Sequence, residues 1–178
     1  MEIGRTQRIY PIEPLVGLRV WRAVDSHSFI HLASMFHGAE WPYSHPLVAR
    51  CNHHGWDPLR PFDRNEHEAP APRCKCGIYA SSSGALRDYL PARLDVVRGL
   101  PIVVGHVALW GVVYGSRRGW RASLAYPQRL YVPVAGLDEH VAGRVLTDLR
   151  LYGVPVESLS GRSGGEVLHE LSDQARAA

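Results

Sequence analysis

The sequence lacks the short motifs by which many proteins reveal their function. Its 178 residues contain no phosphate-binding Gly-Lys-Ser/Thr loop and no strand-anchored Gly-x-Gly-x-x-Gly, so neither motif supports nucleotide binding. The longest apolar run, residues 102–114, is too short to span a membrane and contains glycine and histidine. The first residues lack the apolar core of a secretory signal. These absences predict a cytoplasmic protein that does not enter a membrane.

Lysine is nearly absent as well. Lys75 is the only lysine, arginine supplies every other cationic side chain, and the net charge is +3. A charge this small permits an anionic partner such as nucleic acid without requiring one. Hydrophobic residues make up 46% of the chain and charged residues 21%, as in ordinary globular proteins. We therefore predict one domain over residues 1–178, which is long enough to bury a core.

Cysteine is scarce, and its few copies are clustered. The only three cysteines are Cys51, Cys74 and Cys76. Three cysteines cannot all pair within one chain, and a disulfide between Cys74 and Cys76 would close a strained loop. In a reducing compartment, clustered cysteines are more often metal ligands than parts of a disulfide framework.

The residues around the cysteines have the composition of a loop that needs an external constraint. Residues 37–75 hold six of the 13 prolines and five of the 10 histidines, and their apolar residues show little periodicity. A structureless loop of this length is uncommon inside a compact domain. A bound metal would supply the constraint, so we expect a metal-binding loop at about residues 37–76.

Zinc suits this loop because thiolate and imidazole are its preferred ligands, and four of them complete a closed tetrahedral site. Cys74 and Cys76 are two residues apart, so on a strand both sulfurs point to the same side. His67 is the preferred histidine, because two prolines stiffen the short span between it and Cys74. The predicted zinc ligands are Cys51, His67, Cys74 and Cys76, with His53 and His54 as substitutes for His67.

A catalytic metal is the alternative to a structural one. The nearby carboxylates are Asp57, Asp63, Glu66 and Glu68. One of them could act as general base toward a zinc-bound water if a ligand position were open. Residues 52–54, Asn-His-His, also have a weak likeness to His-Asn-His nucleases, although the paired Cys-x-x-Cys knuckles of those enzymes are missing. Three cysteines and one histidine already close the metal's coordination shell, which favours a structural role.

The hydrophobic pattern predicts an α+β fold with a curved antiparallel sheet, either open or barrel-like, a long zinc-stapled loop and C-terminal helices. The expected strands are residues 18–24, 29–32, 77–80, 102–114, 120–126 and 129–132, and the expected helices are residues 81–90, 137–152 and a segment after a capping box at 163–166. Gly105 and Gly111 are predicted to be bulges or bends in the central strand. Pro127 is predicted to end the strand before it.

A turn after the central strand combines arginine with an aromatic residue. Its side chains are candidates for nucleic-acid contact: Arg117, Arg118, Trp120 and Arg121. The alternation after the turn favours a different placement, with Trp120 in the core. We predict a zinc-stabilised, non-enzymatic binding module with nucleic acid as one candidate partner. The alternative is a zinc-dependent hydrolase or nuclease that uses a carboxylate near the metal.

Three stretches resemble an uncharacterised family of actinobacterial proteins. Residues 67–80 read His-x-Ala-Pro-x-x-x-Cys-x-Cys-Gly-Ile-Tyr-Ala, and residues 119–127 read Gly-Trp-Arg-Ala-x-x-Ala-Tyr-Pro. The apolar run at 104–112 lies between them, and a looser likeness extends to residues 152–156. The resemblance covers about the middle third of the chain. It implies that His67 belongs with Cys74 and Cys76, and it implies no activity.

Overall fold

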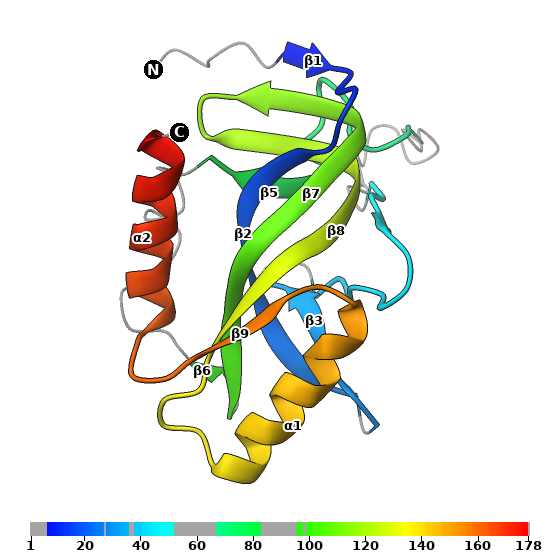
Figure 1. The fold of residues 1–178 in the computed structure, drawn as a ribbon. Helices are drawn as coiled ribbons and strands as arrows, with labels where there is room; N and C mark the ends of the chain where they lie inside the picture. Colours follow the sequence, from blue (N-terminus) through cyan, green and yellow to red (C-terminus); the bar gives the residue numbers. More distant parts are fainter. Residues whose placement is uncertain are drawn as a thin grey trace, which may run out of the picture.

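The computed structural model describes residues 7–26, 28–35, 38–51, 67–82, 96–97 and 99–177. These residues form nine strands and two α-helices, with a short 3₁₀ turn after the first helix (Figure 1). The elements in chain order are β1 (Gln7–Ile9), β2 (Leu15–Asp25), β3 (Ile30–Ser34), β4 (Leu47–Val48), β5 (Ile78–Ser81), β6 (Val96–Val97), β7 (Leu100–Ser116), β8 (Gly119–Pro133), α1 (Glu139–Leu149), η2 (Arg150–Tyr152), β9 (Val156–Leu159) and α2 (Gly164–Ala177).

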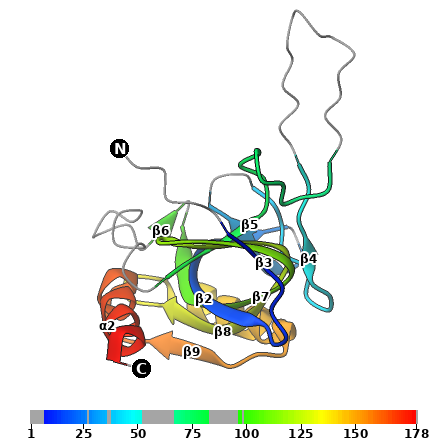
Figure 2. The same ribbon diagram turned by 90° about the horizontal axis from the view of Figure 1, so that it is seen from above.

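The strands form one curved sheet whose main path has the order β1-β7-β2-β5-β8-β4, while β3 pairs with β2, β6 with β7 and β9 with β8. An additional pairing of β7 with β8 bends this sheet into a partial ring, which is visible from above (Figure 2). Strand β2 pairs with β5 through a single residue pair, Leu18 with Ser81, so this is the shortest strand pairing in the ring. The α+β prediction is therefore confirmed. All pairs among the described strands are antiparallel except β8 with β9, a parallel pair that the sequence did not predict.

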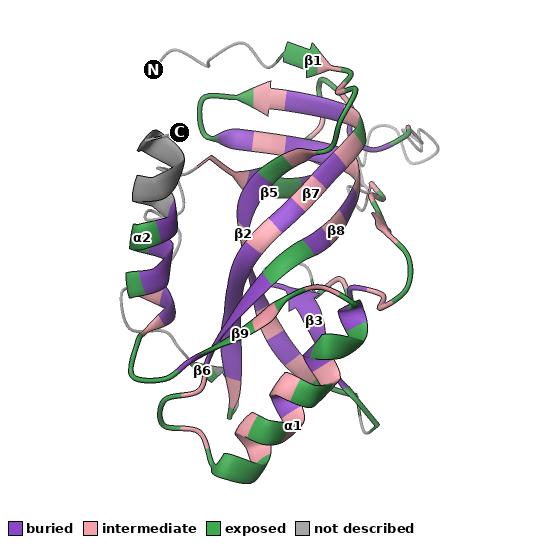
Figure 3. Ribbon diagram, viewed as in Figure 1, coloured by how far each residue is buried: buried purple, intermediate pink, exposed green. Residues whose placement is uncertain are grey.

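Strand β7 is apolar on both faces because both faces are covered. Val103 and Val107 point into the main core inside the curved sheet, while Ile102 and Val104 join a second cluster that packs under α2. Each of these four side chains is at most 2% exposed. The buried residues of β7 and of the inner side of α2 are purple in Figure 3. A continuous apolar run is typical of such a doubly covered strand.

Two glycines of β7 are required by backbone geometry. The pairing of β7 with β8 shifts register after His106 and again between Trp110 and Val113. Gly111 lies inside the second shift with φ +75°, a conformation that favours glycine. A Cβ on Gly105 would lie 2.0 Å from the Arg129 carbonyl oxygen, so only glycine permits this approach of the two strands. The prediction of irregularities near these glycines is confirmed.

The prediction that Pro127 ends a strand was wrong, because β8 continues to Pro133. Pro127 pairs with Val107 and Arg129 pairs with His106, so Gln128 is an extra residue opposite the first register shift. A bulge leaves a residue outside the ladder, and proline is tolerated at such a position although it cannot donate a hydrogen bond. The strand therefore bends at Pro127 without ending.

Helix α1 and its 3₁₀ turn confirm the helix predicted at 137–152. The Asp138 carboxylate caps the first turn by accepting from the backbone N–H groups of His140 and Val141, at 2.9 and 3.4 Å. Gly153 ends the 3₁₀ turn with φ 68°. The predicted capping box of α2 is present too, because Ser163 and Glu166 each accept from the other's backbone N–H, at 3.2 and 2.8 Å. The helix predicted at 81–90 falls mostly on residues 83–90, which lie outside the described residues.

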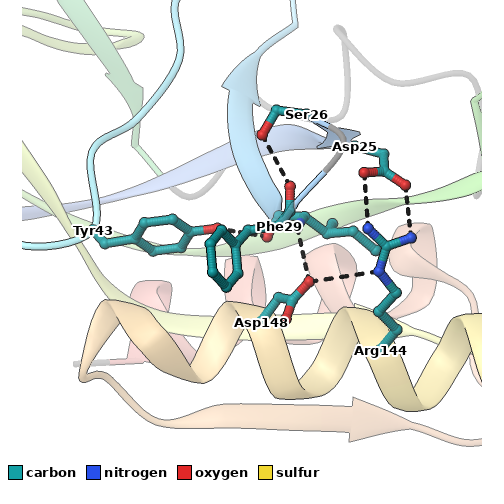
Figure 4. A network of polar contacts seen from close by, with 7 residues as sticks. Asp25, Ser26, Phe29, Tyr43, Arg144 and Asp148 are labelled. Atoms are coloured by element: carbon teal, nitrogen blue, oxygen red, sulfur yellow. Dashed lines mark hydrogen bonds and ion pairs between the residues drawn. The ribbon is translucent and has the colours of Figure 1, made fainter.

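Helix α1 makes polar contacts with the hairpin of β2 and β3, at the lower end of the view in Figure 1. The Arg144 guanidinium donates to both carboxylate oxygens of Asp25, at 2.7 and 2.9 Å (Figure 4). The Asp148 carboxylate accepts from the backbone N–H of Ile30 at 2.8 Å, and the Tyr43 hydroxyl donates to the Ile30 carbonyl at 2.9 Å. These polar contacts fix the hairpin to the helix at the edge of the core.

Candidate metal centre

The predicted ligands come from two segments that the sheet brings together. Cys51 follows β4, which is paired with β8, and the backbone N–H of Ala49 donates to the Ser123 carbonyl of β8 at 2.8 Å. The other three ligands lie in residues 67–76, directly before β5, which also pairs with β8. Strand β8 is thus the common support of both ligand segments.

The four ligand side chains converge on one point. One ligand atom from each of Cys51, His67, Cys74 and Cys76 lies within 4.8 Å of the other three. The Sγ atoms of Cys51 and Cys74 are 3.6 Å apart, and His67 Nε2 is 3.3 Å from Cys76 Sγ. A tetrahedral zinc with ordinary bond lengths would place two sulfurs about 3.8 Å apart, and a sulfur and a nitrogen about 3.5 Å apart. The cluster could therefore hold a metal ion of this kind.

The thiols are free, and a backbone hydrogen bond closes the turn before Cys74. All three cysteines are unbridged, with Cys76 buried and the other two half-buried. The backbone N–H of Cys74 donates to the Ala71 carbonyl at 3.1 Å, which closes a tight turn. Such outer contacts orient metal ligands before the metal binds.

The pKa values of the neighbouring thiols Cys74 and Cys76 are shifted in opposite directions. Burial raises the pKa of Cys74, but hydrogen bonds from the Cys76 backbone and from the Cys76, Cys51 and His67 side chains outweigh it and lower the pKa to about 7. Burial raises the pKa of Cys76 to about 11, and the nearby sulfurs of Cys74 and Cys51 add to the rise. Crowded thiols resist losing all their protons together, and a bound cation relieves that repulsion.

Arg121 of β8 lies directly behind the cluster. Its side chain is 8% exposed, donates to the Cys74 carbonyl and, at 3.0 Å, to the Cys76 carbonyl, and rests 4.9 Å from the centre of the Tyr114 ring. Among the described residues, no carboxylate lies within ion-pairing distance of this buried guanidinium. The alternation of side chains placed Arg121 on the face opposite Trp120. It did not indicate that residues 67–77, the ligand segment that leads into β5, cover that face.

The other residues predicted to contact nucleic acid lie in two different environments. Arg117 and Arg118 are exposed in the turn between β7 and β8, whereas Trp120 is half-buried against the main core. The structure therefore separates Arg121, which supports the ligand segment, from the two exposed arginines of the turn.

The carboxylates proposed for catalysis do not join the described cluster. Glu68 is exposed, and the cluster consists of the three cysteines and His67. The remaining candidates lie outside the described residues: His53, His54, Asp57, Asp63 and Glu66.

Comparisons of the chain with models of protein families, with curated proteins and with solved structures find no match in any of the three. The resemblance to an actinobacterial family therefore stays a prediction. In the part of the chain that the structure describes, no helix is both long and apolar enough to span a membrane.

Proposed function

We propose that the protein is a zinc-stabilised binding module in which Cys51, His67, Cys74 and Cys76 hold a structural zinc ion. The observation that carries this proposal is the convergence of four soft ligand atoms within 4.8 Å of one another. Three sulfurs and one imidazole nitrogen fill a tetrahedral shell and leave no position for a reactive water. A closed shell supports a structural role for the metal.

The positive charge of Arg121 beside the cluster favours a bound zinc with three thiolates over three protonated, metal-free thiols. A zinc ion with three thiolates and a neutral imidazole carries one net negative charge. Arg121 carries one positive charge and contacts the carbonyls of two ligands, Cys74 and Cys76. A buried cation without a counter-charge is costly, and a zinc-thiolate centre would supply that counter-charge.

Metal analysis and cobalt substitution test the zinc proposal. We expect one zinc per chain in purified protein, and a cobalt derivative with the intense thiolate absorption of a tetrahedral Cys₃His site. Protein that stays fully folded with less than stoichiometric metal would refute the proposal. A cobalt spectrum that responds to small anionic inhibitors would reveal an open coordination position and favour a hydrolase instead.

The surface beside the centre supports an anionic polymer as the partner. Residues 67–82 and 113–122 contain five cationic residues, Arg73, Lys75, Arg117, Arg118 and Arg121, and one carboxylate, Glu68. All of these except Arg121 are exposed. Tyr79, whose side chain is on the same face as Arg121, is 50% exposed and offers a ring on which a base can stack. We propose single-stranded nucleic acid as the partner.

Salt-dependent binding of a labelled oligodeoxythymidine tests this partner. Replacing Arg117 and Arg118 together with alanine should weaken binding and lower the slope of log affinity against log salt by about 1.4, for two lost phosphate contacts on a single strand. Arg129→Ala is the matched control, because Arg129 is exposed on a different part of β8 beside Glu157. An unchanged affinity and slope in the double variant would remove this surface as the nucleic-acid interface.

A further inference from the structure

A large cavity opens between β2, the residues after β3 and the segment that leads into β5. Its volume is about 1590 Å³, and its wall includes Arg19, Ser34, Trp41, Tyr43, Ile78 and Tyr79. Arg19 is the cationic residue that β2 contributes to this wall. The proposed function assigns no role to Arg19, Ser34 or Trp41.

Arg19 is held firmly in this wall. Its guanidinium donates to the Tyr79 carbonyl and, at 3.0 Å, to the Ser34 hydroxyl, and it lies 5.0 Å from the centre of the Trp41 ring. The Trp41 indole N–H also donates to the Ser34 hydroxyl, at 3.1 Å. Both contacts use Ser34 as an acceptor, so its own O–H remains available as a donor.

The polar group formed by Arg19, Ser34 and Trp41 has more hydrogen-bond donors than acceptors. A guanidinium has five N–H donors, and the contacts of Arg19 use two groups as acceptors, the Tyr79 carbonyl and the Ser34 hydroxyl. The Arg19 Nε–H is buried and has no acceptor among the described residues, and none of them accepts from the Ser34 hydroxyl. Buried donors are rarely left unpaired in proteins, so the excess indicates a missing acceptor.

The charge of Arg19 is uncompensated as well. Among the described residues, no carboxylate lies within ion-pairing distance of it. Glu40 also lines the cavity, but its carboxylate faces His31 at 3.6 Å and is largely exposed. Burial lowers the pKa of Arg19 to about 10, which leaves it charged at neutral pH.

We propose that Arg19 and Ser34 form a binding site for a small oxyanion, either a carboxylate or a phosphate group, that enters the cavity. The planar guanidinium fork matches the paired oxygens of both groups, and the Ser34 hydroxyl adds a third donor. The anion would supply both the missing acceptor and the missing negative charge. Cys74 and Cys76 line another part of the same cavity, but the donors of the proposed anion site, Arg19 and Ser34, are not metal ligands.

NMR of the arginine Nε–H groups in the full-length protein tests this site. Sodium phosphate and sodium acetate are titrated separately to about 50 mM at constant ionic strength, above the millimolar dissociation constants typical of such small contacts. We expect a saturable shift of the Arg19 signal, identified by its loss in Arg19→Met or in the more conservative Arg19→Lys, with at least one of the two anions. The stronger response identifies the preferred oxyanion. An Arg19 signal that moves with neither anion would overturn the proposal, whether or not Arg19→Met folds stably.

Thermal unfolding with matched variants provides a second readout. The tighter-binding anion should raise the Tm of the wild type and of Arg129→Met equally. Arg19→Met should weaken the response about tenfold or more, and Arg19→Lys should retain part of it, because lysine keeps the charge but lacks the fork. An equal rise in Tm for Arg19→Met and the wild type would assign the anion to another part of the molecule.

Discussion

Helix α1 and the ligand segment at residues 67–77 both fasten an outlying part of the chain to the same sheet, but they use different interactions. Helix α1 buries Val145 and Leu149 completely, and the hydroxyl of the following Tyr152 joins the backbone of Leu32 to that of Trp41. The ligand segment buries only small side chains, of which Ala69 and Cys76 are examples. Burying large apolar side chains stabilises the first region by about 2 kcal/mol for each residue.

The contrast shows which region needs an external partner. The α1 region has its own apolar surface and retains its packing as long as the core exists. The ligand segment has little apolar surface to bury, so its order depends on polar contacts and on whatever the cysteines and His67 bind. Four substitutions test this contrast, from the largest expected effect to the smallest.

Cys76→Ser should have the largest effect. It removes a buried ligand, so we expect loss of the metal and loss of hydrogen-exchange protection in residues 67–77, while α1 keeps its protection. At free zinc 1,000-fold above the dissociation constant, losing the metal removes about 4 kcal/mol of stability. Metal analysis and exchange mass spectrometry measure both effects. His45→Ala is the control, because this exposed histidine lies outside the cluster and should keep its zinc.

Leu149→Ala tests the other region. Leu149 is completely buried, and truncating such a leucine costs about 3 kcal/mol through lost burial and a residual cavity. We expect a lower Tm with an unchanged amount of bound zinc. Zinc loss from the folded variant under native conditions would show that the metal centre depends on the packing of α1, and the distinction between the two regions would fail.

Arg121→Met tests the counter-charge behind the metal. Outer contacts of this kind typically change metal affinity about 10–100-fold, and we expect a decrease of this size when the cation is removed. Competition with a chromophoric chelator measures the affinity. Arg121→Lys should recover part of it, since lysine keeps the charge. A loss of stability in Arg121→Met without any change in zinc affinity would assign Arg121 a packing role only.

Asp138→Ala should have the smallest effect of the four. The Asp138 carboxylate caps α1, and loss of such a cap costs about 1 kcal/mol. Chemical denaturation should show this decrease, with the slope against denaturant unchanged. Asp138→Asn keeps a capping acceptor and should unfold close to the wild type, so a large decrease in both variants would point to a role of the charge itself.

The sequence predicted the parts whose signals are local. Strand β7 carries a long apolar run, α1 has its cap and its closing glycine, and the ligand cluster was visible because cysteine occurs nowhere else in the chain. Strands β1, β4, β6 and β9 have two to four residues each and were missed. Strands this short have little pattern of their own, and β1, β4 and β9 form because distant segments of the chain supply their partners.

The role of Arg121 could not be predicted for a related reason. Its alternation with Trp120 placed it on one face of β8, where it was a candidate for nucleic-acid contact. The ligand segment covers that face because β5 pairs with β8 and carries the segment with it. Burial of Arg121 is therefore a property of the pairing between distant strands.

Strand β8 also determines where the polypeptide can be split or recombined without losing its fold. Its first half pairs with β5 beside the metal ligands, and its second half pairs with β9, which leads into α2. A break or a long insertion between Trp120 and Val132 would therefore separate strands on which both halves of the molecule depend. Exchange of segments between homologous genes, or splitting of the chain into two complementing fragments, should succeed at the turn after Pro133 and fail within β8.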